Sequence, residues 1–221
     1  MITPPAKSTF SASERAAVYR AMRSRRDVRA NFVDDDVPED VLTRVLAAAH
    51  RAPSVGLSQP WRFIVVRDIA SRRRVRAAFE EANAAAAIYP GAQGELYASL
   101  QLQGILEAPV NVCVVCDDDP QRGRGLGRQT MPETARYSTV CAIQNLWLAA
   151  RIEELGVGWV SIIDPLVLHR LLEIPEHLTV VAYLCIGYVG AFADEPDLIR
   201  AGWEAGLPLD AVVDRERYTP R

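Results

Sequence analysis

Residues that commonly hold metals or build disulfide frameworks are scarce in this sequence. Among 221 residues there are three histidines and four cysteines. The histidines lack the H-E-x-x-H spacing of zinc proteases. Cys113 and Cys116 match a C-x-x-C pattern, but no second pair completes a zinc site, and the cysteine spacing is unlike that of a small secreted domain. We therefore predict no metal site, and free thiols, with Cys113 and Cys116 buried on opposite faces of a strand.

Long apolar runs and a strong excess of one charge are also missing. No stretch of about 18 residues is free of a charge or a helix breaker, and the first 11 residues lack the charged-then-apolar order of a signal peptide. The formal net charge of −3 gives no electrostatic footprint for nucleic acid, and the basic residues 72–76 are read as a solvated helix face. We expect a cytoplasmic protein that binds neither a membrane nor nucleic acid.

The length and apolar content that are present suit one sizeable domain over residues 1–221. Hydrophobic residues make up 49 % of the chain, and helical and strand patterns alternate without a repeat or low-complexity segment. This indicates helices around a sheet, of the α/β or α+β class. Helices are expected at 13–24, 38–50, 71–88, from the break at 89–94 to about 106, at 134–155 and at 165–173, and strands at 63–66, 110–116, 156–163 and 179–187.

Two of the predicted helical regions carry further expectations. The break at residues 89–94 indicates the tip of a lid, which we place at about 84–108. The helix at 134–155 has apolar residues too widely spread for one stripe, so we expect it to be buried all round. It would then be both a central core element and an interface between subunits, which predicts a homodimer.

A cluster of charges follows the first predicted helix. It reads Arg25, Arg26, Asp27, Val28 and Arg29. In an extended segment alternate side chains share one face, so two guanidinium groups could hold a phosphate or an electron-rich ring edge with a carboxylate between them. The alternative is a solvated, charged helix terminus.

A polar loop at residues 51–61 joins the second helix to the first strand. It contains two prolines, one glycine, two hydroxyls and an amide, and loops at such corners often carry ligands. Residues 56–60 nearly match a nucleophile elbow, but the last glycine is replaced by proline and the strand-turn-helix context is reversed, which excludes a hydrolase. The glycines at 123–127 lack the dinucleotide fingerprint and are read as a loop with basic tips.

Three segments together resemble the FMN-binding nitroreductase superfamily. They are residues 25–29, residues 52–54 through 59–61, and residues 156–159, in the order and spacing of that superfamily and across nearly the whole chain. The common first motif there resembles R-x-S-x-K, whereas this chain has Asp27 for the serine and Arg29 for the lysine. With residues 127–130, 137–138 and 158–161, this departure resembles the 5,6-dimethylbenzimidazole synthases, the BluB group within the superfamily.

The resemblance implies a fold, a reaction and partners. The fold would be α+β, with a central, mainly antiparallel sheet surrounded by helices, a lid insertion, and FMN at the interface of a homodimer. Reduced FMN would be the substrate and would be fragmented with O2 to 5,6-dimethylbenzimidazole, the lower ligand of vitamin B12, and erythrose 4-phosphate. A separate flavin reductase would supply the reduced FMN.

The resemblance also implies roles for particular residues. Those expected to bind the flavin are Arg25, Arg26, Asp27, Val28, Arg29, Ser54, Gln59 and Ser161. Of these, Asp27 and Ser161 would do the chemistry, because a carboxylate can accept a proton and a hydroxyl can donate one. The alternatives are an ion pair of Asp27 with Arg25 or Arg29, and a hydrogen-bonded core hydroxyl at Ser161.

Two other functions are compatible with the same fold. One is an NAD(P)H-dependent FMN nitroreductase or flavin reductase, in which the flavin survives the reaction. The other is a flavin-binding or flavin-storage protein without catalysis. Fold does not decide between them, but Asp27 in place of the usual serine favours the synthase, and a storage protein would leave Asp27 and Ser161 without a role.

Overall fold

The computed structural model describes residues 9–220. Its centre is a four-stranded sheet in the order β1-β2-β4-β3, with every neighbouring pair antiparallel. The strands are β1 (Trp61–Val66), β2 (Val110–Asp117), β3 (Leu155–Val160) and β4 (Leu178–Tyr188). The inner strands β2 and β4 are rich in buried, β-branched residues, which favour a pleated surface covered on both faces. The predicted α+β class and antiparallel sheet are confirmed.

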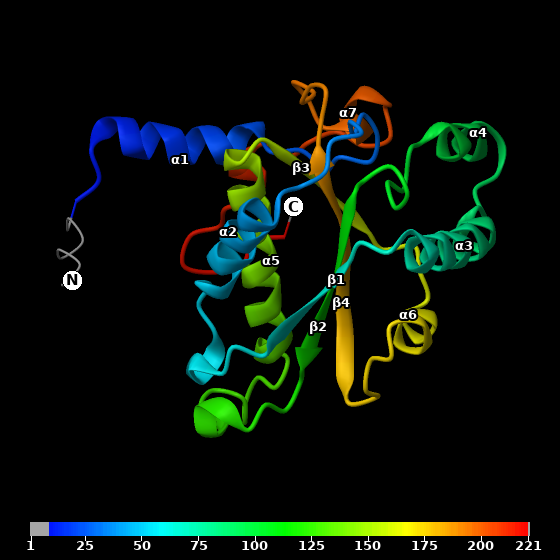
Figure 1. The fold of residues 1–221 in the computed structure, drawn as a ribbon. Coiled ribbons are helices and arrows are strands. Elements are labelled where there is room, and N and C mark those ends of the chain that lie inside the picture. Colours follow the sequence, from blue (N-terminus) through cyan, green and yellow to red (C-terminus); the bar gives the residue numbers. More distant parts are fainter. Residues whose placement is uncertain (1–8, 221) are drawn as a thin grey trace.

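Helices cover both faces of the sheet (Figure 1). On one face lie α2 (Glu39–His50) and α5 (Thr134–Ile152), which bury side chains such as Val112 and Val114. On the other lie α3 (Ile69–Ala86) and α6 (Pro165–Leu171), which bury Cys113 and Val115. Alternate residues of β2 therefore enter two different cores, as the period of a strand requires. All four cysteines are free and both members of the C-x-x-C pair are buried, as predicted.

Helix α1 (Ala12–Ser24) begins one residue before the predicted start at about 13, at the place where the capping-box spacing of Ser11 and Glu14 predicts a helix start. The Ser11 hydroxyl accepts a hydrogen bond from the Glu14 backbone N–H, and the Glu14 carboxylate accepts one from the Ser11 N–H, which is a complete capping box. The helix ends at Arg25, whose extended backbone (φ −66°, ψ 145°) turns the following residues into a strand-like segment. The charge cluster of residues 25–29 is therefore extended.

The second helical piece of the predicted lid is shorter than expected. Helix α4 (Gly91–Ser99) ends at Ser99, so its predicted extension to about 106 is wrong. Backbone carbonyls beyond it bond to side chains from other elements: Leu102 to Arg29, and both Leu106 and Ala108 to Arg72. The Leu102 carbonyl, which a helix continuing to about 106 would have used, thus bonds to a side chain instead.

Helix α5 is not buried all round, so that expectation is wrong for the single chain. Its buried stripe follows helical spacing and consists of Ala135, Ser138, Thr139, Ala142, Ile143, Leu146, Trp147 and Ala150. Between these residues Tyr137 is 53 % exposed and Val140 is 42 % exposed. Apolar residues outside the stripe are thus exposed near the start of the helix, and Ile152 at its end is 65 % exposed.

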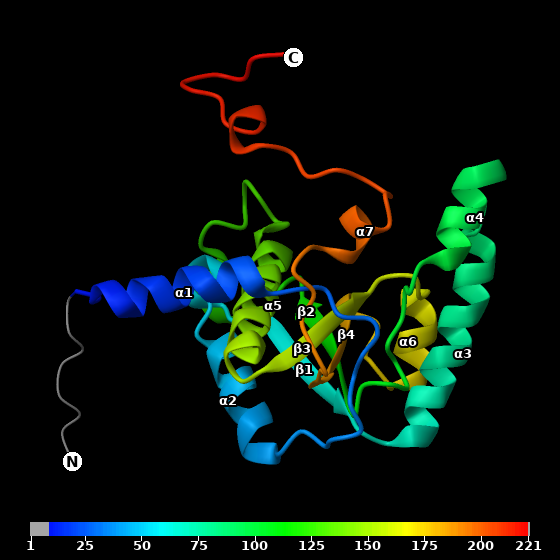
Figure 2. The ribbon, with the colours of Figure 1, turned by 90° about the horizontal axis from the view of Figure 1, so that it is seen from above.

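The C-terminal region runs from β4 through α7 (Asp197–Arg200) and then away from the sheet (Figure 2). It also contains the short helix η3 (Leu209–Ala211). The sequence predicts a tail from Gly190 onward that is anchored at Trp203 and Pro208. The ring of Trp203 packs edge-on against Tyr89, with centroids 5.3 Å apart, which confirms the first anchor. Pro208 is exposed, so the prediction of a second anchor is wrong.

Across residues 9–220 no helix is long and apolar enough to cross a membrane. The prediction that the first 11 residues are not a signal peptide concerns residues that lie mostly outside this range.

Candidate active site

The charge cluster is docked on the edge of the sheet. Asp27 forms a parallel bridge with Val157 of β3, and the Val28 N–H donates to the Val157 carbonyl at 2.9 Å. This close approach requires glycine in β3, because a Cβ atom at Gly158 would stand 2.1 Å from the Val28 carbonyl oxygen. The Gly-Val-Gly-Trp motif at 156–159 therefore makes room for the segment at 25–29.

Asp27 and Arg29 form a hydrogen-bonded pair over the end of β3. The Arg29 Nε and Nη2 atoms donate to Asp27 Oδ2 at 2.9 and 2.6 Å. The other carboxylate oxygen, Oδ1, accepts the Trp159 backbone N–H at 2.9 Å. The Asp27 side chain is 38 % exposed and that of Arg29 is 19 % exposed. The alternative of an Asp27–Arg29 ion pair is thus what the structure contains, and both carboxylate oxygens have donors.

Arg29 also links this pair to the loop between α4 and β2. Its Nη1 donates to the Leu102 carbonyl at 3.0 Å, and Nη2 donates to the Trp159 carbonyl at 2.9 Å. Leu102 lies in that loop, near the end of the predicted lid. The guanidinium group therefore joins Asp27, the end of β3 and the loop before β2.

The two arginines before Asp27 have different surroundings. The Arg26 guanidinium donates to the backbone carbonyls of Arg23 and Arg25, at 2.8 and 2.6 Å, and of Asp194. The Arg25 guanidinium lies over the ring of Trp147, 5.1 Å from its centroid. Within residues 9–220 no carboxylate forms an ion pair with Arg25, so its donors remain available for an anion.

Val28 is buried, and its backbone contributes the bridge to β3. The side chains of Val28 and Arg26 thus serve the protein's own packing and backbone bonds. Their predicted contact with a flavin rests on the resemblance alone.

Ser161 follows the last residue of β3 and is exposed. It stands two residues after Trp159, whose N–H and carbonyl bond to Asp27 and Arg29. The alternative of a core hydroxyl is wrong, since the residue is not in the core. Ser161 thus lies next to the Asp27–Arg29 pair along the chain.

The polar loop before β1 is a second, separate region. The Ser54 hydroxyl accepts the Gln59 N–H at 3.0 Å, and the Ser138 hydroxyl near the start of α5 accepts the Val55 N–H at 3.1 Å. The loop includes the short helix η1 (Val55–Leu57) and has positive φ at Gly56, Leu57 and Gln59, of 57°, 55° and 47°. In the part of the chain described, no hydrogen bond or ion pair joins this loop to Asp27 or Arg29.

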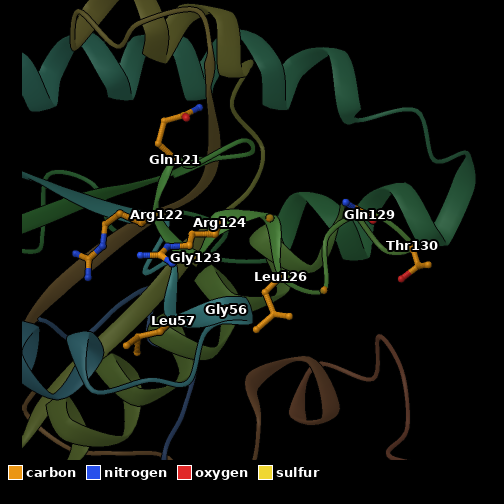
Figure 3. A pocket seen from close by; sticks show the side chains of 11 residues that line it. Gly56, Leu57, Gln121, Arg122, Gly123, Arg124, Leu126, Gln129 and Thr130 are labelled. Atoms are coloured by element: carbon orange, nitrogen blue, oxygen red, sulfur yellow. The ribbon is translucent and has the colours of Figure 1, made fainter.

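This loop borders a wide cavity of about 1070 Å³ (Figure 3). The glycine-rich segment with helix η2 (Arg122–Gly125) forms its other wall. The two walls pack through backbone, because a Cβ atom at Gly56 would stand 2.9 Å from the Gly123 carbonyl oxygen. Arg122 and Arg124 are exposed here, as expected for basic loop tips, whereas Arg128 pairs with Asp119 at 2.9 Å.

The two regions lie at opposite ends of α5. Near its start Ser138 holds the loop, and near its end the Trp147 Nε1 donates to the Arg26 carbonyl at 3.0 Å. Nine residues of helix separate these contacts, which is about 14 Å of rise. The structure therefore brings together Asp27, Arg29 and the backbone beside Ser161, but it does not bring Ser54 and Gln59 to them.

Two contributors to the arginine site, which we define as residues 25–29 and the groups that hold them, were not predicted from the sequence. Trp147 was read only as part of an apolar helix, and Leu102 as part of a helical lid. No sequence signal marks the Leu102 carbonyl, because any residue supplies one. A signal for Trp147 was present, since a tryptophan in a buried stripe needs a partner for its indole N–H.

The buried thiols are poor candidates for nucleophiles. Burial raises the pKa of Cys113 to about 12 and that of Cys116 to about 11. Both are therefore protonated near neutral pH, whereas a nucleophilic cysteine acts as the thiolate. In residues 9–220 no group of three or more histidine, cysteine, aspartate or glutamate side chains is placed to hold a metal ion.

Known proteins resemble this chain in sequence and in fold. The 5,6-dimethylbenzimidazole synthase of Rhodospirillum rubrum is 46 % identical over 204 residues, covering 92 % of this chain and 96 % of its own. The 5,6-dimethylbenzimidazole synthase of Rhodobacter capsulatus is 47 % identical over 202 residues, covering 91 % and 97 %. Oxidized iodotyrosine deiodinase bound to FMN and 3-iodo-L-tyrosine has a TM-score of 0.71 at 22 % identity, over 91 % of this chain and 100 % of its own, which shows a shared fold.

A sequence model described as the Nitroreductase family matches residues 22–188. This span includes the arginine site, the polar loop and the whole sheet. The chain belongs to the Nitroreductase family.

Proposed function

We propose that this chain is a 5,6-dimethylbenzimidazole synthase, which fragments reduced FMN in the presence of O2 to 5,6-dimethylbenzimidazole and erythrose 4-phosphate. The observation that carries this proposal is the 46 % identity with the Rhodospirillum rubrum synthase over nearly the full length of both chains. Fold alone would not carry it, because one fold hosts many reactions. The substrate class is a reduced flavin mononucleotide.

The arginine site suits a flavin phosphate in its chemistry. A phosphate monoester needs donors that are not already neutralised, and Arg25 has no carboxylate partner among residues 9–220. Arg29 is committed to Asp27, Trp159 and Leu102, and Arg26 to backbone carbonyls. We assign Arg25 to the phosphate, and Arg29 to orienting Asp27 beside the flavin.

Asp27 and Ser161 are the proposed catalytic residues. Reduced flavin itself reacts with O2, so the protein must supply a shielded pocket, a fixed ribityl chain and groups that move protons. Asp27 is held by the Trp159 N–H on Oδ1 and by Arg29 on Oδ2, and Oδ1 keeps a second lone pair that can take a proton. The exposed Ser161 hydroxyl has no competing partner in the described chain and is free to donate.

A homodimer would join the two separated regions. One chain places Asp27 and Gln59 at opposite ends of α5, and the exposed Tyr137 and Val140 lie at the Ser138 end of that helix. A two-fold interface places the same patch of both chains in contact. The loop of one chain could then complete the arginine site of the other, so we propose two composite sites per dimer.

We further propose that a separate flavin reductase supplies the substrate and that the enzyme works in the cytoplasm. The chain has no recognisable nicotinamide fingerprint. The nitroreductase and storage alternatives are not favoured, because the 46 % identity over nearly the full length is with a synthase, because Asp27 stands in place of the usual serine, and because a storage protein would leave Asp27 and Ser161 without a catalytic role.

The test is the fate of the flavin. The protein is mixed with excess chemically reduced FMN and air, and the small molecules are analysed by mass spectrometry. We expect 5,6-dimethylbenzimidazole to form as FMN is lost. With NADH and oxidised FMN alone, we expect little product. Full recovery of FMN, together with rapid NAD(P)H oxidation when a nitroaromatic is present, would refute the synthase and favour a nitroreductase.

A further inference from the structure

We infer that Trp147 is a positioning residue that holds Arg25 in place for the flavin phosphate. The inference rests on the proposed function, because it assumes that Arg25 meets a phosphate. Trp147 lies on α5, whereas residues 25–29, the arginine segment, follow α1. Trp147 is only 9 % exposed.

Three contacts connect Trp147 to the arginine site. Its indole N–H donates to the Arg26 carbonyl at 3.0 Å. The Arg25 guanidinium carbon lies 5.1 Å from its ring centroid. The Trp159 ring, at the end of β3, packs against it with centroids 6.4 Å apart. The indole thus has a fixed position, and Arg25 rests on it.

Stacking on an aromatic ring suits an arginine that must bind an anion. The attraction acts through the face of the aromatic ring on a cation within about 6 Å of the ring centroid, and it occupies no guanidinium N–H donor. The N–H donors point outward in the plane of the group and remain free for bidentate contact with a phosphate. A carboxylate partner would occupy those same donors, as Asp27 does for Arg29. The indole can therefore orient Arg25 without neutralising it.

The backbone bond adds a second restraint. Arg25 and Arg26 directly follow the end of α1, and the bond from Trp147 holds the Arg26 carbonyl against α5. The Arg151 Nε donates to the Ser24 carbonyl at 3.4 Å on the same helix end. Helix α5 therefore fixes the start of the arginine segment, while β3 fixes its end.

The experiment compares the binding of FMN with that of riboflavin, which lacks the phosphate. Dissociation constants of both are measured for the wild type, Trp147→Leu and Trp147→Phe. For Trp147→Leu, which loses the ring face and the N–H, we expect the preference for FMN to fall about three- to tenfold while riboflavin binding changes little. For Trp147→Phe, which keeps a ring, the fall should be smaller.

A merely structural role would weaken both ligands equally and leave their ratio unchanged, which would overturn the inference. Trp61→Phe is the matched control: it also removes a buried indole N–H bond, to His50 Nδ1 at 3.1 Å, and should leave the ratio unchanged. If Trp147→Leu does not fold, Trp147→Phe decides, and an unchanged ratio in that variant overturns the inference.

A double-mutant cycle with Arg25→Ala identifies the route of the effect. If Trp147 acts through Arg25, the double variant Arg25→Ala/Trp147→Leu should have the same FMN-to-riboflavin ratio as Arg25→Ala alone. Additive losses would show that Trp147 acts by another route and would overturn the inference.

Formation of 5,6-dimethylbenzimidazole by the wild type is measured separately. If the wild type forms product but the FMN-to-riboflavin ratio is unchanged in the Trp147 variants, the inference is overturned and the proposed function is retained. If the wild type forms no product, the proposed function is overturned. If the wild type binds riboflavin as tightly as FMN, the phosphate role of Arg25 is overturned, and the inference with it.

Discussion

The arginine segment at 25–29 and the polar loop at 54–59 differ in the contacts that hold them within one chain. The arginine segment is held by α5 and β3, and it presents the free donors of Arg25 beside the paired Asp27. The loop is held by its own Ser54–Gln59 bond and by Ser138, at the far end of α5. The first region is organised by tertiary contacts around charged groups, and the second is a self-contained turn.

Only the arginine segment can be understood from the contacts of one chain. Donors, an acceptor and a lid contact converge at Asp27 and Arg29 within a single subunit. The loop offers the side chain of Gln59 and an adjoining cavity, and one chain leaves both apart from Asp27 and Arg29.

The largest expected effect is at Asp27. Asp27→Asn preserves the shape and an acceptor for the Trp159 N–H but cannot take a proton. We expect 5,6-dimethylbenzimidazole formation to fall about 10²- to 10⁴-fold, as for loss of a general base, with FMN binding retained. Product yield at saturating reduced FMN measures this. A loss below about threefold would remove Asp27 from the proton-transfer role. Ser161→Ala should lower the yield by a smaller factor.

The docking of the arginine segment can be broken from the sheet side. In Gly158→Ala the new Cβ would overlap the Val28 carbonyl, so the segment at 25–29 must move away from β3. Overpacking of this kind costs about 1–3 kcal/mol or more, which corresponds to a fall in melting temperature of about 2–12 °C for a chain of this size. We also expect FMN affinity to fall.

Thermal unfolding and flavin titration measure both effects. Gly190→Ala is the matched control, because its Cβ would meet no atom closer than 3.9 Å. Equal behaviour of the two variants would show that the approach of Val28 to β3 is not required.

Mixed dimers test whether the two regions meet across subunits. Asp27→Asn and Gln59→Ala chains, each defective alone, are co-expressed with different tags. Random pairing would leave about a quarter of all sites with both regions intact, because a mixed dimer has one fully wild-type site. Product formation should recover toward that fraction.

Asp27→Asn mixed with Arg25→Ala is the matched control for this recovery. Both changes then lie in the arginine segment, so every site of a mixed dimer keeps one defect and recovery should be absent. Equal recovery in the two mixtures, or light scattering that finds a monomer with FMN bound, would contradict composite sites.

The smallest expected effect is at Ser54. Ser54→Ala removes the acceptor of the Gln59 N–H, and loss of one such bond costs about 1 kcal/mol. We expect the melting temperature to fall by about 2–4 °C, with a modest loss of product. A tenfold loss of product at unchanged melting temperature would instead indicate that the Ser54 hydroxyl contacts the flavin directly.

Local sequence patterns determined much of this protein. The capping box placed α1, and the buried β-branched runs placed the central strands. The alternation in Arg25, Asp27 and Arg29 indicated a charged face in an extended segment. Each of these depends on residues a few positions apart, whose spacing alone sets which side chains share a face. The arginine cluster at 25–29, followed in order by the motifs at 52–61 and 156–159, carried the resemblance that led to the family.

Only the tertiary structure decided how the site is built. Asp27 meets the Trp159 N–H across 132 residues of sequence, and Trp147 reaches the Arg26 carbonyl across 121. The lid helix ends at Ser99, and the Leu102 carbonyl, which an extension to about 106 would have used, accepts from Arg29 instead. Backbone groups carry no sequence signature, and the separation of the two regions is set by the length of α5. The packing of α5 and β3 around the arginine segment therefore decided which charges are paired and which remain free.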